Sequence, residues 1–383
     1  MMKNTLYIPF LLLSAGLCAQ TALYNTGNLR IHDGGEMGFH TDLINDGSFD
    51  ENQGLAGFYS TDSRSINGSL PPTFQDVEFL TQTGTFLNNP VNVSNNANFI
   101  SGDVITIPAQ PGITLNFLDT AFPSGENNAS KVNGYASVSG QQDFTFPVGD
   151  SEQLRQLSLN SEGINNLAKA AYFFEDPNSP SEFPAFSTNS RANGINEIST
   201  SEFWRLEGSV PSSVQLTWNN RSDIASLSED VEEIVVVGWS KITNQWEMLG
   251  GPASVGDLIN GVAISGSFIP DDYEVLTFGA FGEPRDFLDL ENYFVSPNGD
   301  GINDFLEIPE LALSPNNHMM IFDRQGSKVF EKTNYTNEFN GLSNQNNFVI
   351  NREGGLPSGV YFYIVSLDDL NLEFQGFLYL AND

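Results

Sequence analysis

Short apolar segments separated by Asn, Gly and Asp dominate residues 24–120. Examples are GLAGFY, VEFL and DVITI, and a spacing of often ~10–20 residues is typical of short strands joined by turns. The phrases LINDGSF, FLNNPVNV and NANFISGD are weakly similar, each with Asn or Asp close to a Phe. Two folds fit the region 21–125. One is a β-solenoid, with Asn aligned at the turns and Phe or Val directed inward, and the other is a sandwich with Asn-rich loops. We favour the solenoid slightly.

Residues 126–281 have longer strand patterns and predict an antiparallel β-sandwich. SVQLTWNN and YEVLTFGAF alternate apolar and polar residues, and EEIVVVGWS is a continuous apolar run that indicates an interior strand. DFTFPVGD predicts a strand that ends at Pro147, and one or two helical turns are expected within 163–173. We expect the tryptophans to be core residues, because buried aromatics dominate such cores. All four lie in this region: Trp204, Trp218, Trp239 and Trp246.

The N-terminus has the pattern of an export signal over residues 1–20. Lys3 supplies a positive charge, residues 6–13 are apolar, and small residues follow. The apolar stretch is shorter than the about 20 residues that a membrane span needs, and no later segment approaches that length. We therefore expect cleavage after Ala19 or Gln20 and a mature chain without a transmembrane span.

The single cysteine, Cys18, lies inside this signal. It raises a lipoprotein alternative, which Leu17 disfavours because a small residue is expected directly before a lipid-modified cysteine. Cleavage leaves a mature chain without thiols, so its stability must come from core packing or bound metal and not from disulfides. Because Cys18 is lost with the signal, the mature chain can have neither a thiol nucleophile nor a thiolate metal site.

Composition narrows the choice of function. Hydrophobic residues make up 39% of the chain, aromatic residues 12% and charged residues 16%, with 35 Gly and 19 Pro, which excludes a helical bundle and a disordered chain. The net charge is −33, from 15 Lys and Arg against 48 Asp and Glu. Such a chain is repelled by phosphate backbones and anionic lipids, so we expect no nucleic-acid partner.

A linker at 282–290 precedes a compact block, residues 291–383, of about the size of one immunoglobulin-like β-sandwich. The block contains four ordered motifs: FVSPNGDGINDFLEI (294–308), MMIFDRQGSKVFEKTNYTNEFNGL (319–342), GGLPSGVYFYIVSL (354–367) and FQGFLYL (374–380). The strand GVYFYIVSL alternates between two faces. One face receives Val360, Phe362 and Ile364, and the other receives Tyr361, Tyr363 and Val365.

In this order and spacing the motifs resemble the gliding motility-associated C-terminal domain, the type B sorting domain of the Bacteroidetes type IX secretion system, over residues ~290–383. Gln325 and Phe339 stand where that family usually has Trp. The resemblance implies Sec export across the inner membrane and passage through the type IX translocon, with the C-terminal domain as address. It also implies a secreted or outer-membrane surface location and the translocon with its sorting machinery as partner.

The loop at 296–307 approaches a calcium-binding template. With Ser296 in the first position, oxygen ligands fall at alternate places and Gly301 at the sharp turn. The candidate ligands are Asn298, Asp300, Asp304 and Glu307. Ser in place of Asp at the first position, and Pro297 after it, favour a plain turn whose Asn, Asp and Gly adopt left-handed conformations. Calcium is the one cofactor that the sequence suggests.

Enzymatic machinery is not visible, and we predict no catalytic residue. No local pattern joins any of the three histidines, His32, His40 and His318, to a nucleophile, and the Gly-rich stretches lack the Lys of a phosphate-binding loop. The leading hypothesis is a noncatalytic adhesion or matrix-binding passenger, residues 21–285, whose partners are surface glycans or matrix. The alternatives are a secreted polysaccharide-acting hydrolase, since 48 acids allow carboxylate pairs, and a structural component of the gliding or secretion apparatus.

Overall fold

The structure is a computed structural model that describes residues 22–251, 253–282, 293–308, 311, 314, 316–345, 355–367 and 372–382. The predicted signal and most of the predicted linker lie outside these residues. The chain divides into two compact units, Met1–Phe281 and Gly282–Asp383, which we call the N-terminal and C-terminal units. Both are built from strands, so the predicted all-β class is confirmed. Among the described residues, no helix has the length and apolarity to cross a membrane.

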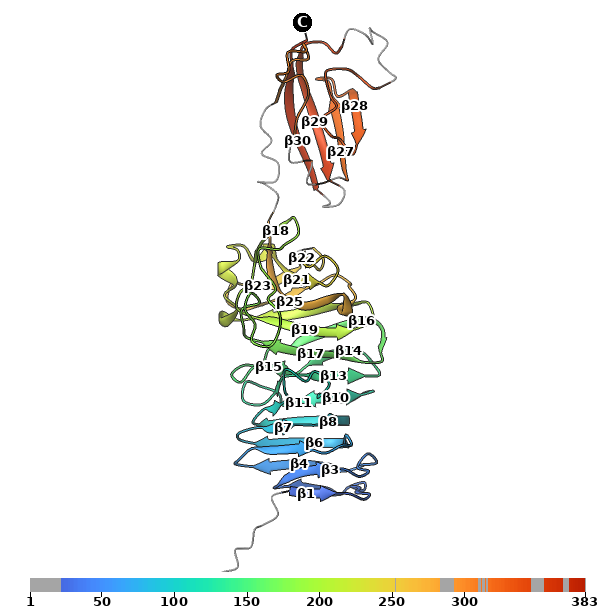
Figure 1. Cartoon of the computed structure of the whole chain (residues 1–383), viewed down its shortest axis with the longest axis vertical. Helices are drawn as coiled ribbons and strands as arrows, with labels where there is room; N and C mark the ends of the chain where they lie inside the picture. Colours follow the sequence, from blue (N-terminus) through green and yellow to red (C-terminus); the bar gives the residue numbers. More distant parts are fainter. Residues whose placement is uncertain are drawn as a thin grey trace, which may run out of the picture. The chain divides into compact units, whose positions relative to one another are not determined.

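The first half of the N-terminal unit is a β-solenoid, which confirms the favoured prediction (Figure 1). Successive coils add parallel strands to two sheets. The first sheet consists of β1 (Ala22–Asn25), β3 (Asp42–Asn45), β5 (Arg64–Asn67), β7 (Thr85–Leu87), β9 (Val104–Ile105), β12 (Val132–Asn133) and β15 (Val148–Gly149). The second begins with β2 (Glu36–Phe39), β4 (Leu55–Ser60), β6 (Thr73–Thr81), β8 (Val91–Ser101), β10 (Leu115–Leu118) and β13 (Ala136–Ser139), with β11 (Phe122–Ser124) beside β8.

A column of phenylalanines fills the interior of the coils. Phe39, Phe58, Phe79 and Phe99 are direct neighbours across β2, β4, β6 and β8, and all four are buried. The rings of Phe39 and Phe58 stack with their centroids 4.8 Å apart, and those of Phe58 and Phe79 lie 5.9 Å apart. The strand repeat of about 4.8 Å places equivalent side chains of successive coils in contact, so one aromatic per coil builds a continuous core.

Asparagines align between coils, as the solenoid hypothesis predicted. Asn25 and Asn45 are register partners at the ends of β1 and β3, and Asn25 Nδ2 donates to Asn45 Oδ1 at 2.7 Å. Asn52 accepts from the Ile31 amide at 2.8 Å and donates to the Thr73 carbonyl at 2.8 Å in the next coil. These side chains satisfy buried backbone groups that a turn would otherwise leave unpaired.

The second half of the N-terminal unit is antiparallel, and it continues the second solenoid sheet without a break. β13 pairs in parallel with β10 and antiparallel with β17. The added strands are β17 (Ala168–Phe173), β19 (Phe203–Gly208), β25 (Tyr273–Phe281), β21 (Ile234–Ser240) and β22 (Trp246–Met248), with β18 (Ile195–Ile198) beside β25. A further sheet contains β14 (Gln141–Phe146), β16 (Leu157–Asn165), β20 (Ser212–Trp218), β24 (Gly261–Ile264) and β23 (Ser254–Gly256). Short 3-10 helices lie at η1 (Asn220–Ser222), η2 (Ile224–Ser226), η3 (Val231–Glu233) and η4 (Pro270–Asp272).

One hydrophobic core extends from Ile31 in the solenoid to Phe278 in β25. The regions expected at 21–125 and 126–281 therefore share a sheet and a core inside one compact unit. The unit ends at Phe281, next to the expected linker.

Details of the antiparallel half test the strand predictions. β14 ends directly before Pro147, and β21 is buried on both faces, which explains its continuous apolar run. Three of the four tryptophans are buried and the fourth, Trp239, packs against the core. The prediction of one or two helical turns within 163–173 was wrong, because the structure has strands there. Ala168 and Ala170 lie in β17, where they pair with β13 and pack into the core, so tertiary burial overrides the helix propensity of Ala.

The described strands of the C-terminal unit form one five-stranded sheet. Its order is β26 (Tyr293–Val295), β30 (Leu372–Leu380), β29 (Gly359–Leu367), β27 (Asn317–Phe322) and β28 (Lys328–Thr333). Tyr361, Tyr363 and Val365 lie on one face of β29, as the alternation of this strand predicted, and the structure buries that face. Leu306 and Phe339, from segments between strands, belong to the same hydrophobic core as these side chains.

Candidate functional site

The 296–307 loop of the C-terminal unit is organised around Asp304. Its Oδ1 accepts the Gly299 amide at 2.7 Å and its Oδ2 accepts the Gly301 amide at 2.8 Å. Both glycines have positive φ, +78° and +81°, a conformation that strains residues with a side chain. The carboxylate therefore holds a tight turn, as the plain-turn alternative describes.

The other predicted calcium ligands lie around the same turn. Asn298 Oδ1 accepts the Asp300 amide at 2.9 Å, and Asp300 Oδ1 accepts the Ile302 amide at 2.8 Å. Glu307 is exposed. The described residues contain no group of three or more His, Cys, Asp or Glu side chains placed to hold a metal ion. Carboxylate and amide oxygens keep spare lone pairs in this arrangement, so calcium binding stays a prediction for experiment.

The other motifs of the C-terminal unit form turns and core. Asp323 Oδ1 accepts the amides of Gln325 and Ser327 at 2.8 and 2.9 Å and closes the hairpin between β27 and β28. Gln325, at one of the two positions where Trp is usual, is exposed. Phe339, at the other, is buried against Phe330 with the ring centroids 5.1 Å apart. The substitution of Phe for Trp thus keeps an aromatic in the core.

On the N-terminal unit, two rows of outward side chains cross the second solenoid sheet. The side chains alternate with the buried Phe column, so they lie on the outer face of β2, β4, β6 and β8. The first row consists of Glu36, Leu55, Asp76 and Asn96. The second consists of Gly38, Gly57, Glu78 and Asn98, continued by Ser124 of β11. We call these two rows, with Tyr59, the polar face.

Tyr59 lies flat on this face. A Cβ at Gly57 would meet the Tyr59 ring at 2.1 Å, and one at Gly38 would lie 3.4 Å from it. The ring therefore covers both glycines, and only the missing side chain at Gly57 permits that approach. Tyr59 Oη donates to Glu78 Oε2 at 2.7 Å, and Asn98 Nδ2 donates to Glu78 Oε1 at 3.2 Å.

Negative charge surrounds the tyrosine. Burial, the hydrogen bond to Glu78 and the charges of Glu78 and Glu36 together raise the pKa of Tyr59 to about 12. The hydroxyl therefore stays protonated at physiological pH and remains a donor to Glu78. The face combines an aromatic ring that is partly exposed with carboxylate acceptors and amide groups that both donate and accept.

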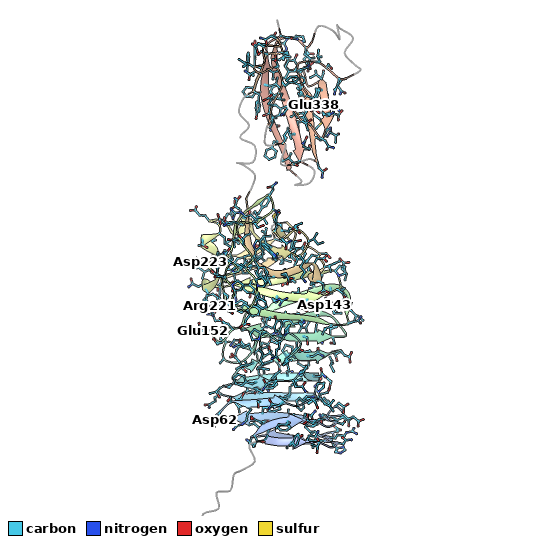
Figure 2. All side chains as sticks on the ribbon, viewed as in Figure 1. Asp62, Asp143, Glu152, Arg221, Asp223 and Glu338 are labelled. Atoms are coloured by element: carbon cyan, nitrogen blue, oxygen red, sulfur yellow. The ribbon has the colours of Figure 1, made fainter. Side chains whose placement is uncertain are left out.

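A hollow of about 390 Å³ lies elsewhere on this unit, lined by Asp150, Glu152, Phe174, Glu175 and Arg221 among others. Figure 2 shows Glu152 and Arg221 on the same side of the unit, and their side chains approach to 3.6 Å. Arg221 also pairs with Asp150 and lies 3.8 Å from the centre of the Phe174 ring. Although burial opposes it, the Arg221 hydrogen bond lowers the pKa of Asp150. The arginine is thus already held by protein groups.

Behind this hollow lies a buried ion pair. Arg155 and Glu202 approach to 2.7 Å, and Tyr172 Oη donates to the other Glu202 oxygen at 2.5 Å. Burial and the Glu202 charge raise the pKa of Tyr172. Arg155 also lies over the Trp204 ring, 5.4 Å from its centroid. Both charges of this cluster are thus paired inside the core.

The histidines are distributed over both units. His40 Nδ1 lies 3.1 Å from the Tyr59 carbonyl in the N-terminal unit, whereas His318 Nε2 lies 3.0 Å from Glu331 in the C-terminal unit. The expectation that the chain has no catalytic residue stays a prediction.

Comparison with known proteins identifies the C-terminal unit. Residues 288–380 match the family described as CHU_C type IX secretion signal domain. The resemblance seen in the sequence is thereby confirmed. The match supports export by the type IX secretion system, to the medium or the cell surface, and implies interaction with that machinery. No curated protein and no solved structure matches the chain.

Sequence reasoning missed the polar face and the regular coil that builds it. The coil length is encoded in the spacing of Phe39, Phe58, Phe79 and Phe99, which recur at intervals of about 20 residues. The position of Tyr59 over Gly57 has no comparable signal, because it depends on pairing between coils.

Proposed function

We propose that the N-terminal unit is a noncatalytic adhesive passenger that binds neutral polysaccharide on its polar face, outside the cell. The observation that supports this most directly is the Tyr59 ring lying flat over Gly38 and Gly57 beside Glu78 and Asn98. A tyrosine has an apolar body and a polar tip, so it suits a ligand with both characters.

The chemistry of the face matches a sugar. The C–H face of a pyranose ring packs on an exposed aromatic ring, while its hydroxyls both donate and accept hydrogen bonds. A carboxylate has about four lone-pair sites, so Asp76 and Glu78 can accept sugar hydroxyls beside the bonds that they take from Asn95, Tyr59 and Asn98. The two rows of the polar face continue over neighbouring coils, so the face suits a chain of sugars.

The negative charge of the polar face favours neutral polysaccharides over anionic ones as ligands. Glu36, Asp76 and Glu78 all lie on the polar face, and the whole chain has a net charge of −33. Sulfated or uronic-acid polymers would be repelled by this surface, whereas a neutral polymer would not.

The test uses the full chain on an array of neutral and sulfated oligosaccharides. Tyr59→Ala and Glu78→Gln should each weaken binding to the neutral glycans about tenfold, which is about 1.4 kcal/mol. Tyr24→Ala is the matched control, because Tyr24 is a solvent-exposed tyrosine on the other solenoid sheet. Unchanged binding in both site variants would refute the assignment. Release of reducing sugar from the bound polymers would instead favour the hydrolase.

A further inference from the structure

The outer face of the C-terminal sheet carries a continuous aromatic surface. Two rows of register partners cross it, Phe294–Tyr379–Val360 and Phe377–Phe362–Phe322. The rings of Phe294 and Tyr379 stack, with centroids 6.0 Å apart. Five of these side chains are strongly exposed: Phe294 48%, Val360 44%, Phe362 50%, Phe377 43% and Tyr379 45%. We call this surface the aromatic face.

These side chains lie outside the hydrophobic core of the unit. The hydrophobic core lies on the opposite side of the sheet, where Tyr361, Tyr363 and Val365 alternate with them along β29. Isolated exposed apolar residues are ordinary on protein surfaces, but a contiguous patch marks a surface that another molecule covers.

Two hollows are lined in part by residues of the aromatic face. One of about 560 Å³ is lined by Phe322, Phe362 and Phe377 together with Asp323 and Arg324 of the β27–β28 turn. The other, of about 450 Å³, is lined by Phe294 and Phe305 and by the acidic side chains of Asp304 and Glu307. No basic side chain lines this second hollow among the described residues. The surface is thus apolar at its centre and negative at one margin.

We propose that the aromatic face is the docking surface for a protein of the type IX export machinery, whose complementary surface has apolar side chains at its centre and Lys or Arg facing Asp304 and Glu307. The family match supplies the kind of partner, and the acidic margin supplies its charge. A second copy of this chain fits poorly, because residues 293–383 contain 12 acidic and 4 basic residues and two such surfaces repel. An anionic membrane is repelled for the same reason.

The test is export of the full chain from a bacterium that has a type IX secretion system. The double variant Phe362→Ser/Phe377→Ser should reduce the protein outside the cell at least tenfold, with the missing protein folded and protease-resistant in the periplasm. Ile242→Ser/Val255→Ser is the matched control, because it removes two exposed aliphatic side chains, 80% and 68% exposed, from the N-terminal unit. Export of the Phe double variant at the wild-type level would overturn the proposal.

A charge reversal keeps the proposal testable if the double variant fails to fold. Glu307→Lys, at an exposed position, should lower export several-fold, while Glu229→Lys on the N-terminal unit should leave it unchanged. Normal export of Glu307→Lys would refute the claim that the partner places Lys or Arg opposite Asp304 and Glu307. Sedimentation showing a dimer that dissociates in the Phe double variant, with export intact, would assign the face to a second copy and overturn the proposal.

Discussion

Removing one ring from the phenylalanine column should weaken the whole N-terminal unit. Phe58 is fully buried, and its ring stacks on Phe39 at 4.8 Å and on Phe79 at 5.9 Å, with Phe74 edge-on at 5.9 Å. Truncation to Ala in such a site costs about 3–5 kcal/mol, through lost transfer free energy and the remaining cavity. For a unit of this size each kcal/mol corresponds to roughly 2–4 °C, so Phe58→Ala should lower the melting temperature by about 6–20 °C.

Two spectroscopic probes distinguish a local effect from a shared one. All four tryptophans lie between residues 204 and 246, so their fluorescence reports only the antiparallel half, whereas far-UV circular dichroism reports strands throughout. Because the two halves share a sheet and a core, the fluorescence transition of Phe58→Ala should shift with the dichroism transition. Phe122→Ala, which truncates a half-exposed phenylalanine of β11, is the control and should change stability by only about 0.5 kcal/mol. A fluorescence transition that stays at the wild-type temperature would refute the coupling, and equal melting of both variants would refute the packing argument.

Three further predictions concern the site and the sorting unit. Calcium at a hundredfold excess over its Kd should stabilise the C-terminal unit by about 2.7 kcal/mol and raise its melting temperature by on the order of 10 °C. Asp300→Ala should abolish the shift and Asp62→Ala should not. Equal melting in calcium and in chelator at matched ionic strength would show that the loop is a turn without calcium. Deletion of residues 286–383 should leave the N-terminal unit in the periplasm, since the secretion signal match begins at residue 288; cell fractionation that still finds it outside would contradict this. Gly57→Ala should displace the Tyr59 ring, because the new Cβ would lie 2.1 Å from it, and should reduce glycan binding about as much as Tyr59→Ala; undiminished binding on the array would show that the ring position is irrelevant.

Local sequence patterns predicted those parts of the fold that depend on neighbours along the chain. The alternation in GVYFYIVSL places Tyr361 and Phe362 on opposite faces of the strand, and in the structure the first is buried and the second exposed. The apolar run of β21 indicated an interior strand for the same reason. The expected helix within 163–173 failed because the burial of Ala168 and Ala170 is decided by strands far away in sequence.

The candidate sites show the same division. The 296–307 loop could be found because its polar residues lie a few positions apart, although its carboxylates turned out to bind backbone amides. The polar face could not be found, because Glu78 and Asn98 become neighbours only when coils stack. The aromatic face likewise depends on the order of β26, β30, β29 and β27, in which the first and last strands of the chain segment are brought together.

Because the solenoid is built from repeated coils, its length depends on the number of coils. Each coil occupies about 20 residues between successive phenylalanines of the column and advances the stack by about 4.8 Å. Because both neighbours of an inner coil present the same pair of edges, an added coil would pair with them as the existing ones do, and the antiparallel strands that close the far end would be unaffected. Duplicating residues 59–79 should therefore lengthen the solenoid and extend the polar face without unfolding it, which small-angle scattering would measure. Coil number would then set the length of the solenoid and of the polar face without any change to the secretion signal domain at residues 288–380.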